Sequence, residues 1–268
     1  MSIEQNIVKY SEASADILSI LESGAINNEI LKDKIIDYMY RNKISSLNTY
    51  SWEDLSEIAS SGLAPELFSI GDTRLMEIRG KIYNAVLLAF NYDRIALNPE
   101  SEAYKKYNNN TGLAGMTFGL KEVYEDFFQF EGLNRNNYNY DATVINSILN
   151  NYMLELLEED LQIVMMDIYR NYDGEDKQFK MYLPTEYEIL GKNTFGTDNT
   201  EVFKQYPYYV EYPENIKKYD ITSKRSNYWT ATKCNKNNTS YVYISSGGSS
   251  NYSKALNTTI NVSFCFCL

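Results

Sequence analysis

The chain of 268 residues contains no histidine. This absence excludes an imidazole general base, Ser-His and Cys-His nucleophile pairs, and every metal site that needs a histidine ligand. Its three cysteines, Cys234, Cys265 and Cys267, are too few for a disulfide framework. On a strand, Cys265 and Cys267 would share one face, and we expect buried free thiols there, with a metal or redox role as the alternative.

Long apolar runs are also missing. No stretch reaches the 18 apolar residues of a membrane span, so we expect no membrane insertion. The N-terminus, MSIEQNIVKYSEASADIL, lacks the cationic start and apolar run of a signal peptide. We therefore expect folding in a cytoplasm, with release by lysis or as part of a particle.

Acidic residues are absent from one region only. The chain has 36 Asp and Glu, yet none lies between Ile221 and Leu268. The five Lys and Arg of this tail give it a net charge of +5 and leave −16 on residues 1–220, within a total of −11. The acidic total argues against DNA or an anionic membrane as the main partner, and the asymmetry indicates that the tail meets a different partner from the rest.

The tail is rich in small polar residues and tyrosine. About two-thirds of positions 226–261 are Asn, Ser, Thr, Tyr or Gly, a composition that binding loops use. Tyr241 and Tyr243 alternate with Val242 and Ile244, so we expect the tyrosines to point outward. Trp229 is expected in the core, with a sugar-stacking role as the alternative. The predicted contact residues are Thr230, Thr232, Lys233, Asn235, Asn237, Asn238, Tyr241, Tyr243, Asn251, Tyr252, Lys254 and Asn257.

Hydrophobic periodicity predicts an α+β fold with long polar loops. Two amphipathic helices in 3–41 would pack on a neighbouring chain or cover the main domain. A helix capped by Ser51 and ended by Gly62 follows. The remaining predicted elements are a strand that starts at 67 and runs into a turn at 71–72, strands at 74–78, 81–91 and 180–183, helices at 141–167 and 186–190, and short strands in the tail.

No residue set predicts catalysis. Two groups of carboxylates could serve glycoside hydrolysis, but we expect a solvated helix face for each of them. The groups are Glu122, Glu125 and Asp126, and the run 158–160. A phosphate-binding glycine loop, a serine nucleophile elbow and an EF-hand are all missing. We expect no catalytic residues, no metal and no cofactor.

Several segments between residues 48 and 268 resemble, in order, the motifs of an uncharacterised domain family of gut bacteria and their phages. They are SWEDLSEIASSGLAPELFSIGDTRLMEI, AFNYD, AGMTFGLK, MYLPTEYEILG, YWTATK, YVYISSGGSSNY and VSFCFCL. Family members typically show W-x-D-I, F-x-x-G-D-T, G-F-N-H-D, G-I-T-F-G-L, L-S-E-x-E-x-F-G, Y-W-T-A-S and V-A-F-G-F-C-I at these places. Tyr92 stands where the family often has a histidine, and Ser263-Phe264 replaces its Arg-Pro.

This family is similar to C-type-lectin-like folds, whose C-terminal end is the binding surface. The resemblance implies a C-type-lectin-like ligand-binding domain at 45–268, with a variable-type C-terminal region at 226–262. It also implies an N-terminal helical segment, 1–44, for attachment or oligomerisation, similar to the head of phage tail-associated proteins. Some such proteins are diversified by retroelements that rewrite Asn codons mainly to Ser, Thr, Tyr, Asp, Gly and Ile, and Lys233, Lys236 and Lys254 would then be fixed.

Together these features predict a receptor-binding protein of a phage tail, assembled in the cytoplasm and carried on the virion. Its partners would be a host cell-surface protein or glycan and, through the N-terminal helices, other tail proteins. We expect a homo-oligomer, such as a trimer, because weak sites gain strength from multivalency, and no nucleic-acid partner. The alternatives are a fixed-specificity bacterial surface or glycan-binding module, cytoplasmic or at the cell surface, and a carboxylate-dependent hydrolase.

Overall fold

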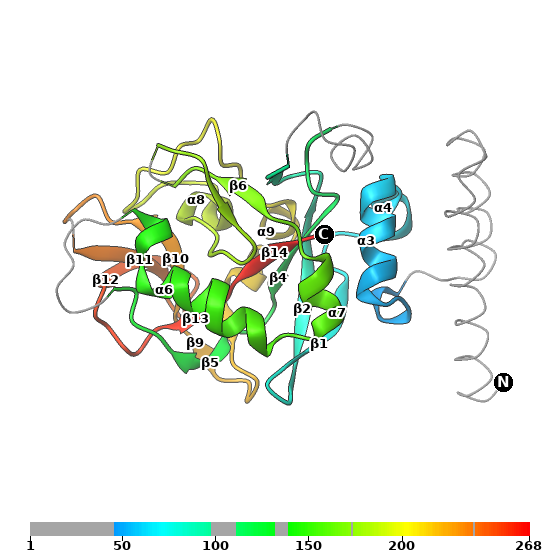
Figure 1. Ribbon diagram of the computed structural model, residues 1–268. Coiled ribbons are helices and arrows are strands. Elements are labelled where there is room, and N and C mark those ends of the chain that lie inside the picture. Colours follow the sequence, from blue (N-terminus) through cyan, green and yellow to red (C-terminus); the bar gives the residue numbers. More distant parts are fainter. Residues whose placement is uncertain (1–45, 98–110, 132–138, 173, 238) are drawn as a thin grey trace, which may run out of the picture.

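The computed structural model describes residues 46–97, 111–131, 139–172, 174–237 and 239–268 (Figure 1). The predicted attachment segment 1–44 lies outside the described residues. Helices and strands are both present, as the predicted α+β class requires. In the part of the chain that the structure describes, no helix is both long and apolar enough to cross a bilayer.

The first sheet is antiparallel, with strand order β1-β2-β4-β14. β2 lies inside this sheet, as the nearly continuous apolar run of 81–91 predicts, and every residue of β4 is buried. Cys265 and Cys267 of the last strand are buried free thiols, as predicted. The strands are β1 (Thr73–Ile78), β2 (Lys81–Phe90), β4 (Met116–Leu120) and β14 (Cys265–Cys267).

Helix α3 (Trp52–Ser61) begins and ends as the sequence predicts. Ser51 and Asp54 form a reciprocal capping box, and Gly62 ends the helix in the left-handed region, with φ of 78°. Trp52 buries its ring against the first sheet, edge-on to Phe118 and Phe266 with ring centroids 5.8 Å apart in each pair. The helix therefore covers one face of the sheet.

The second sheet contains most of the tail and has the strand order β12-β11-β10-β13-β5. In Figure 1 its orange and red strands lie at the end of the molecule opposite α3. Because β13 and β14 are nearly consecutive, residues 261–267 pass from the second sheet into the first and tie the two together. Its strands are β5 (Tyr124–Phe127), β10 (Tyr228–Lys233), β11 (Ser240–Ile244), β12 (Ser250–Lys254) and β13 (Asn261–Val262).

Two small sheets and several short helices complete the described fold. The sheets are β3 (Arg94–Ile95), β6 (Ile168–Arg170) and β7 (Lys177–Phe179), and then β8 (Lys218–Tyr219) and β9 (Arg225–Ser226). The helices are η1 (Leu47–Thr49), α4 (Ala64–Leu67), η3 (Tyr140–Ala142), α6 (Val144–Ser147), η4 (Ile148–Met153), η5 (Leu154–Leu156), α7 (Glu159–Val164), α8 (Glu186–Leu190), α9 (Pro207–Glu211) and η6 (Pro213–Ile216).

Three predicted elements differ in the structure. The strand predicted from residue 67 is wrong, because helix α4 ends at Leu67, but the predicted turn at 71–72 is present, and in it Asp72 accepts from the Ser69 amide at 2.9 Å. The helix predicted at 141–167 is broken into short pieces, because Leu157 is extended. The strand predicted at 180–183 is reduced to one antiparallel bridge, in which Tyr182 and Cys265 exchange both backbone hydrogen bonds. The amides of Lys180 and Met181 donate instead to Asn150 Oδ1.

Lys218 is an unusual core residue, because its charged group is buried with the side chain. Its ammonium group donates a hydrogen bond to the carbonyl of Leu120, which also accepts from Ser263 Oγ at 3.1 Å. Burial lowers the pKa of Lys218 to about 8. The folded chain therefore holds this lysine at an energetic cost at neutral pH.

Candidate recognition surface

The hairpin of β11 and β12 forms one edge of the second sheet. Val242 pairs with Tyr252, and Tyr243 pairs with Asn251. The predicted glycine turn links the strands, and Gly248 adopts φ of +83°, which glycine favours. Within the described ranges no further strand lies beside β12. This hairpin therefore presents tail residues at the margin of an ordered sheet.

The twelve predicted contact residues separate into groups of different exposure. Five are exposed, three are half-buried, three are buried, and Asn238 lies outside the described residues. The exposed residues are Asn235, Asn237, Asn251, Tyr252 and Lys254; the half-buried ones are Lys233, Tyr243 and Asn257; the buried ones are Thr230, Thr232 and Tyr241.

The prediction that Tyr241 points outward is wrong. Its side chain is 4% exposed, and its ring stacks on that of Phe130. Val242 and Ile244, on the opposite face of β11, are buried as expected. The alternation of tyrosine with aliphatic residues does not predict exposure here, because both faces of β11 are covered. The core covers one face, and the segment that contains Phe130 covers the other.

Trp229 is a core residue, as predicted. It is fully buried, and its indole N–H donates to the carbonyl of Phe128 at 3.1 Å. Its ring meets Phe130 and Tyr243 edge-on, with centroids 5.4 Å and 6.1 Å apart. Trp229 therefore supports the surface from below.

Thr230 and Thr232 are also buried, so the prediction that they contact a ligand is corrected. Thr230 Oγ1 donates to the carbonyl of Val242 at 3.0 Å. Thr232 Oγ1 accepts from the amide of Glu186 at 2.7 Å and donates to the carboxylate of Asp198 at 2.8 Å. Both threonines attach β10 to its surroundings.

Glu186 is the most important residue that the sequence analysis missed. It lies in the first turn of α8, and Thr185 and Glu188 close a capping box there. Its buried carboxylate accepts from the amides of Phe195 and Gly196 at 3.1 Å and 2.8 Å. Ser250 Oγ at the start of β12 donates to it as well. Glu186 thus joins α8, the segment 192–200 and the acid-free tail.

Asp198 is the second carboxylate beneath the tail. It accepts from Thr232 Oγ1 and, at 3.2 Å, from the amide of Tyr187. Burial raises the pKa of Asp198 to about 6, against the opposing effect of these hydrogen bonds. No sequence motif pointed to Asp198, because it is distant from Thr232 in the sequence and meets it only in the folded chain.

The segment 192–200 lies beside β12 and the turn at 235–236. The ring of Phe195 meets that of Tyr252 at a 5.1 Å centroid distance and an angle of 62°. The amide of Asn235 donates to the carbonyl of Phe195 at 2.7 Å. A Cβ at Gly196 would overlap the methyl group of Thr232, so close packing requires glycine here. These contacts bring exposed Asn235, Tyr252 and Lys254 to one end of the molecule.

A buried charged cluster holds α8 in place. Arg170 on β6 donates to the carboxylates of Asp93 and Glu188, and all three side chains are at most 2% exposed. Tyr182 and Thr117 donate to Asp93 Oδ2, each at 2.8 Å. Burial opposes the charge of Arg170, but Glu188 and Asp93 outweigh it and keep its pKa above the ordinary value. The cluster joins β4, β6 and α8 below the recognition surface.

The predicted carboxylate groups are engaged with neighbouring donors. Glu122 accepts from the amide and side chain of Asn84 at 2.9 Å and 2.8 Å. Glu125 pairs with Lys81, and Asp126 lies 4.0 Å from Arg79. In the other group, Glu158 accepts from the indole of Trp52 at 2.6 Å and the amide of Glu77 at 3.2 Å. Each group thus fixes local structure.

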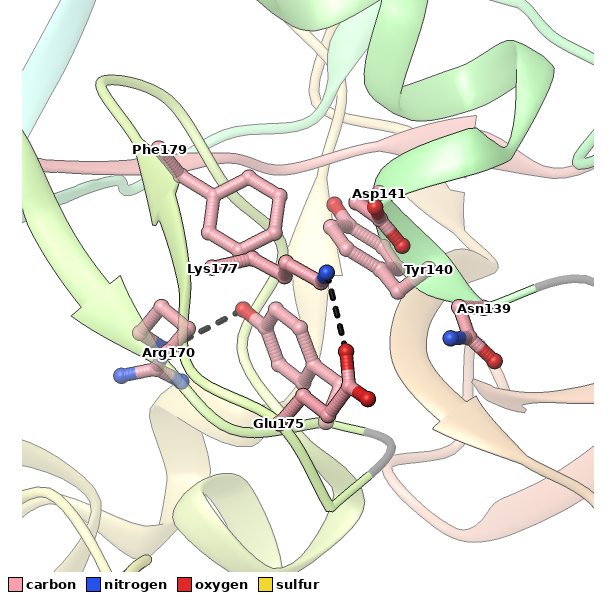
Figure 2. Close-up of a pocket in the computed structure, with 8 residues that line it drawn as sticks. Asn139, Tyr140, Asp141, Arg170, Glu175, Lys177 and Phe179 are labelled. Atoms are coloured by element: carbon pink, nitrogen blue, oxygen red, sulfur yellow. Dashed lines mark hydrogen bonds and ion pairs between the residues drawn. The ribbon is translucent and has the colours of Figure 1, made fainter.

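Hollows elsewhere differ greatly in size. Figure 2 shows a cavity beside η3 and β7, with the Lys177–Glu175 ion pair at its mouth and Arg170 behind it. Its volume of about 10 Å³ suits one water molecule. An open groove of about 500 Å³ lies between β2 and the β8–β9 turn, lined by Ile82, Asn84, Glu122, Tyr219, Asp220, Ile221 and Ser223.

The thiols and carboxylates of the described ranges form no group of three suited to a metal ion. Cys265 and Cys267 are buried, and burial raises the pKa of both thiols. Thiols held in this protonated state pack as small apolar groups.

Comparison of the chain with models of known protein families, with curated proteins and with solved structures finds no match.

Proposed function

We propose that the chain is a ligand-binding protein whose recognition surface consists of the exposed tail residues and the segment 192–200. The observation that carries this proposal is the division of the tail into two sets. Thr230, Thr232 and Tyr241 are buried and hold the frame, whereas the exposed Asn, Tyr and Lys side chains lie outside it. Such side chains can change without loss of a core contact, and they have the composition of binding loops.

The same proposal includes a biological setting. The chain acts as a phage tail receptor-binding protein with a C-type-lectin-like domain, attached to the virion as an oligomer through residues 1–44. A retroelement diversifies region 226–262. Support comes from the motif resemblance and from the position of the C-terminal strands, which place the polar hairpin at one end of the molecule (Figure 1).

Adsorption of the labelled full chain to a panel of bacterial cells tests binding. Among the cells that the wild-type chain binds, Tyr252→Ala should lower the affinity roughly tenfold, since exposed aromatic residues dominate many interfaces. Tyr152→Ala is the matched control, because Tyr152 is 42% and Tyr252 is 39% exposed. Equal binding by the wild-type chain and both variants, or by none of them, would contradict the proposal.

Sequence variation across one natural population tests diversification. We expect variable codons at exposed positions such as Asn235, Asn251 and Tyr252, with Trp229 and Thr232 constant. A uniform tail would instead indicate a fixed-specificity binding module.

A further inference from the structure

The recognition surface carries exposed cations without ionic partners. Lys236 and Lys254 are exposed, and in the described part of the chain neither lies in an ion pair. Lys254 pairs in register with Ser240, whose carbonyl accepts from the amide of Cys234 at 2.9 Å. The two lysines therefore flank the same end of the β11–β12 hairpin.

Two carboxylates that lie beneath the tail are already occupied by hydrogen-bond donors. Glu186 is fully buried and accepts from two amides and from Ser250. Asp198 accepts from Thr232 and Tyr187. Since the tail contributes no carboxylate of its own, the positive charge of Lys236 and Lys254 is presented to a ligand.

An aromatic platform accompanies the cations. Tyr252 lies two residues before Lys254 on β12, so both side chains leave the same face of the strand. Phe195 supports the Tyr252 ring edge-on, and the ring remains partly exposed. Ring faces of this kind stack on the apolar face of a sugar, while the side-chain oxygen of exposed Asn235 accepts hydrogen bonds from sugar hydroxyls.

We propose that this surface binds an anionic polysaccharide of the host envelope. Tyr252 stacks on a sugar ring, and Lys236 and Lys254 pair with its carboxylate or phosphodiester groups. This inference rests on the proposed binding function and names its ligand class. The rest of the chain is strongly acidic, so a polyanion is repelled elsewhere and directed to this end of the molecule.

Binding of the full chain to three soluble polysaccharides tests the proposal: polygalacturonate, which carries carboxylates, phosphomannan, which carries phosphodiesters, and neutral dextran. We expect binding to at least one of the two anionic polymers and weaker binding at 300 mM than at 50 mM salt. Lys236→Gln with Lys254→Gln should weaken that binding about three- to tenfold. Lys121→Gln is the control. Lys121 is exposed on the β4–β5 turn, so this substitution removes one positive charge away from the recognition surface. Which anionic polymer binds distinguishes carboxylate from phosphodiester recognition.

Adsorption to cells separates failure of this inference from failure of the proposed function. If Tyr252→Ala abolishes adsorption while neither anionic polymer binds or competes, the chain is a binder of another ligand class and the inference is wrong. Binding to dextran as strong as to the anionic polysaccharides would also overturn it. If Tyr252→Ala leaves adsorption unchanged and no polymer binds, both proposals fail.

Discussion

The ring of Tyr241 stacks on the ring of Phe130, with centroids 3.6 Å apart and planes inclined by 20°. The pair closes the lower face of β11, where Tyr241 is almost fully buried. Tyr241→Ala should therefore lower the free energy of unfolding by about 3–5 kcal/mol, as large-to-small changes in cores do. Chemical denaturation measures this loss.

Tyr252 is the natural comparison, because it lies on the neighbouring strand but remains exposed. Tyr252→Ala should change the free energy of unfolding by no more than about 0.5 kcal/mol. Similar losses for the two variants would show that Tyr252 belongs to the frame, and would remove the division on which the proposed function rests.

Arg170 should be far more important for stability than an exposed arginine. Arg170→Met leaves the carboxylates of Asp93 and Glu188 buried without their cation, which should cost about 3–5 kcal/mol at pH 7. Arg94→Met breaks the exposed pair with Asp176 and should cost less than about 1 kcal/mol. Urea denaturation at pH 7 and pH 5 compares them. A deficit of the Arg170 variant that fails to shrink at pH 5 would contradict this account, because burial raises the pKa of Glu188 and its protonation removes one of the uncompensated charges.

Asp198 should make stability depend on acidic pH. Its pKa of about 6 lies above the unfolded value of about 3.9, so between these values the folded chain binds more protons. The stabilisation is complete below about pH 4 and is lost as the pH rises through 6, by up to about 3 kcal/mol. Asp198→Asn should abolish this dependence, measured by thermal unfolding from pH 4 to 7.5. An unchanged pH profile in the variant would assign the dependence to other groups.

Lys218 should act in the opposite direction at alkaline pH. Its pKa of about 8 lies below the unfolded value of about 10.4, so the unfolded chain binds more protons between them. Stability should rise as the pH increases through 8, and Lys218→Met should be more stable than wild type at pH 7 by about 1–3 kcal/mol. The carbonyl of Leu120 keeps its bond from Ser263 in this variant. Lys121→Met, at an exposed site, should show no gain; a less stable Lys218 variant would refute the expectation.

Local signals in the sequence predicted the elements that depend on neighbouring residues. The cap of Ser51, the stop at Gly62 and the tail strands follow from side chains within a few positions. The strand expected at 180–183 is only one bridge long for a long-range reason, since Asn150 in a distant helix accepts from the amides of Lys180 and Met181. Periodicity contains no information about such a partner.

The residue types of the recognition surface could be predicted from the sequence, but which of its residues are buried could not. Alternation along β11 placed Tyr241 outside, because the sequence does not reveal that the segment of Phe130 covers it. Glu186 and Asp198 were missed for a related reason: their relation to Thr232 exists only after α8 packs beside β10. A buried carboxylate that accepts backbone amides has no spacing motif.

The pairing of β4 with β14 joins Thr117 to Cys267, which follows it by 150 residues. A ribosome adding about 5–20 residues per second needs roughly 8–30 s to make the intervening chain. During that time β4, whose five residues are all buried in the finished protein, lacks the strand that completes its edge. The nascent chain therefore passes through an interval in which it is prone to aggregate, and chaperones present during translation would decide how much of it reaches the folded state.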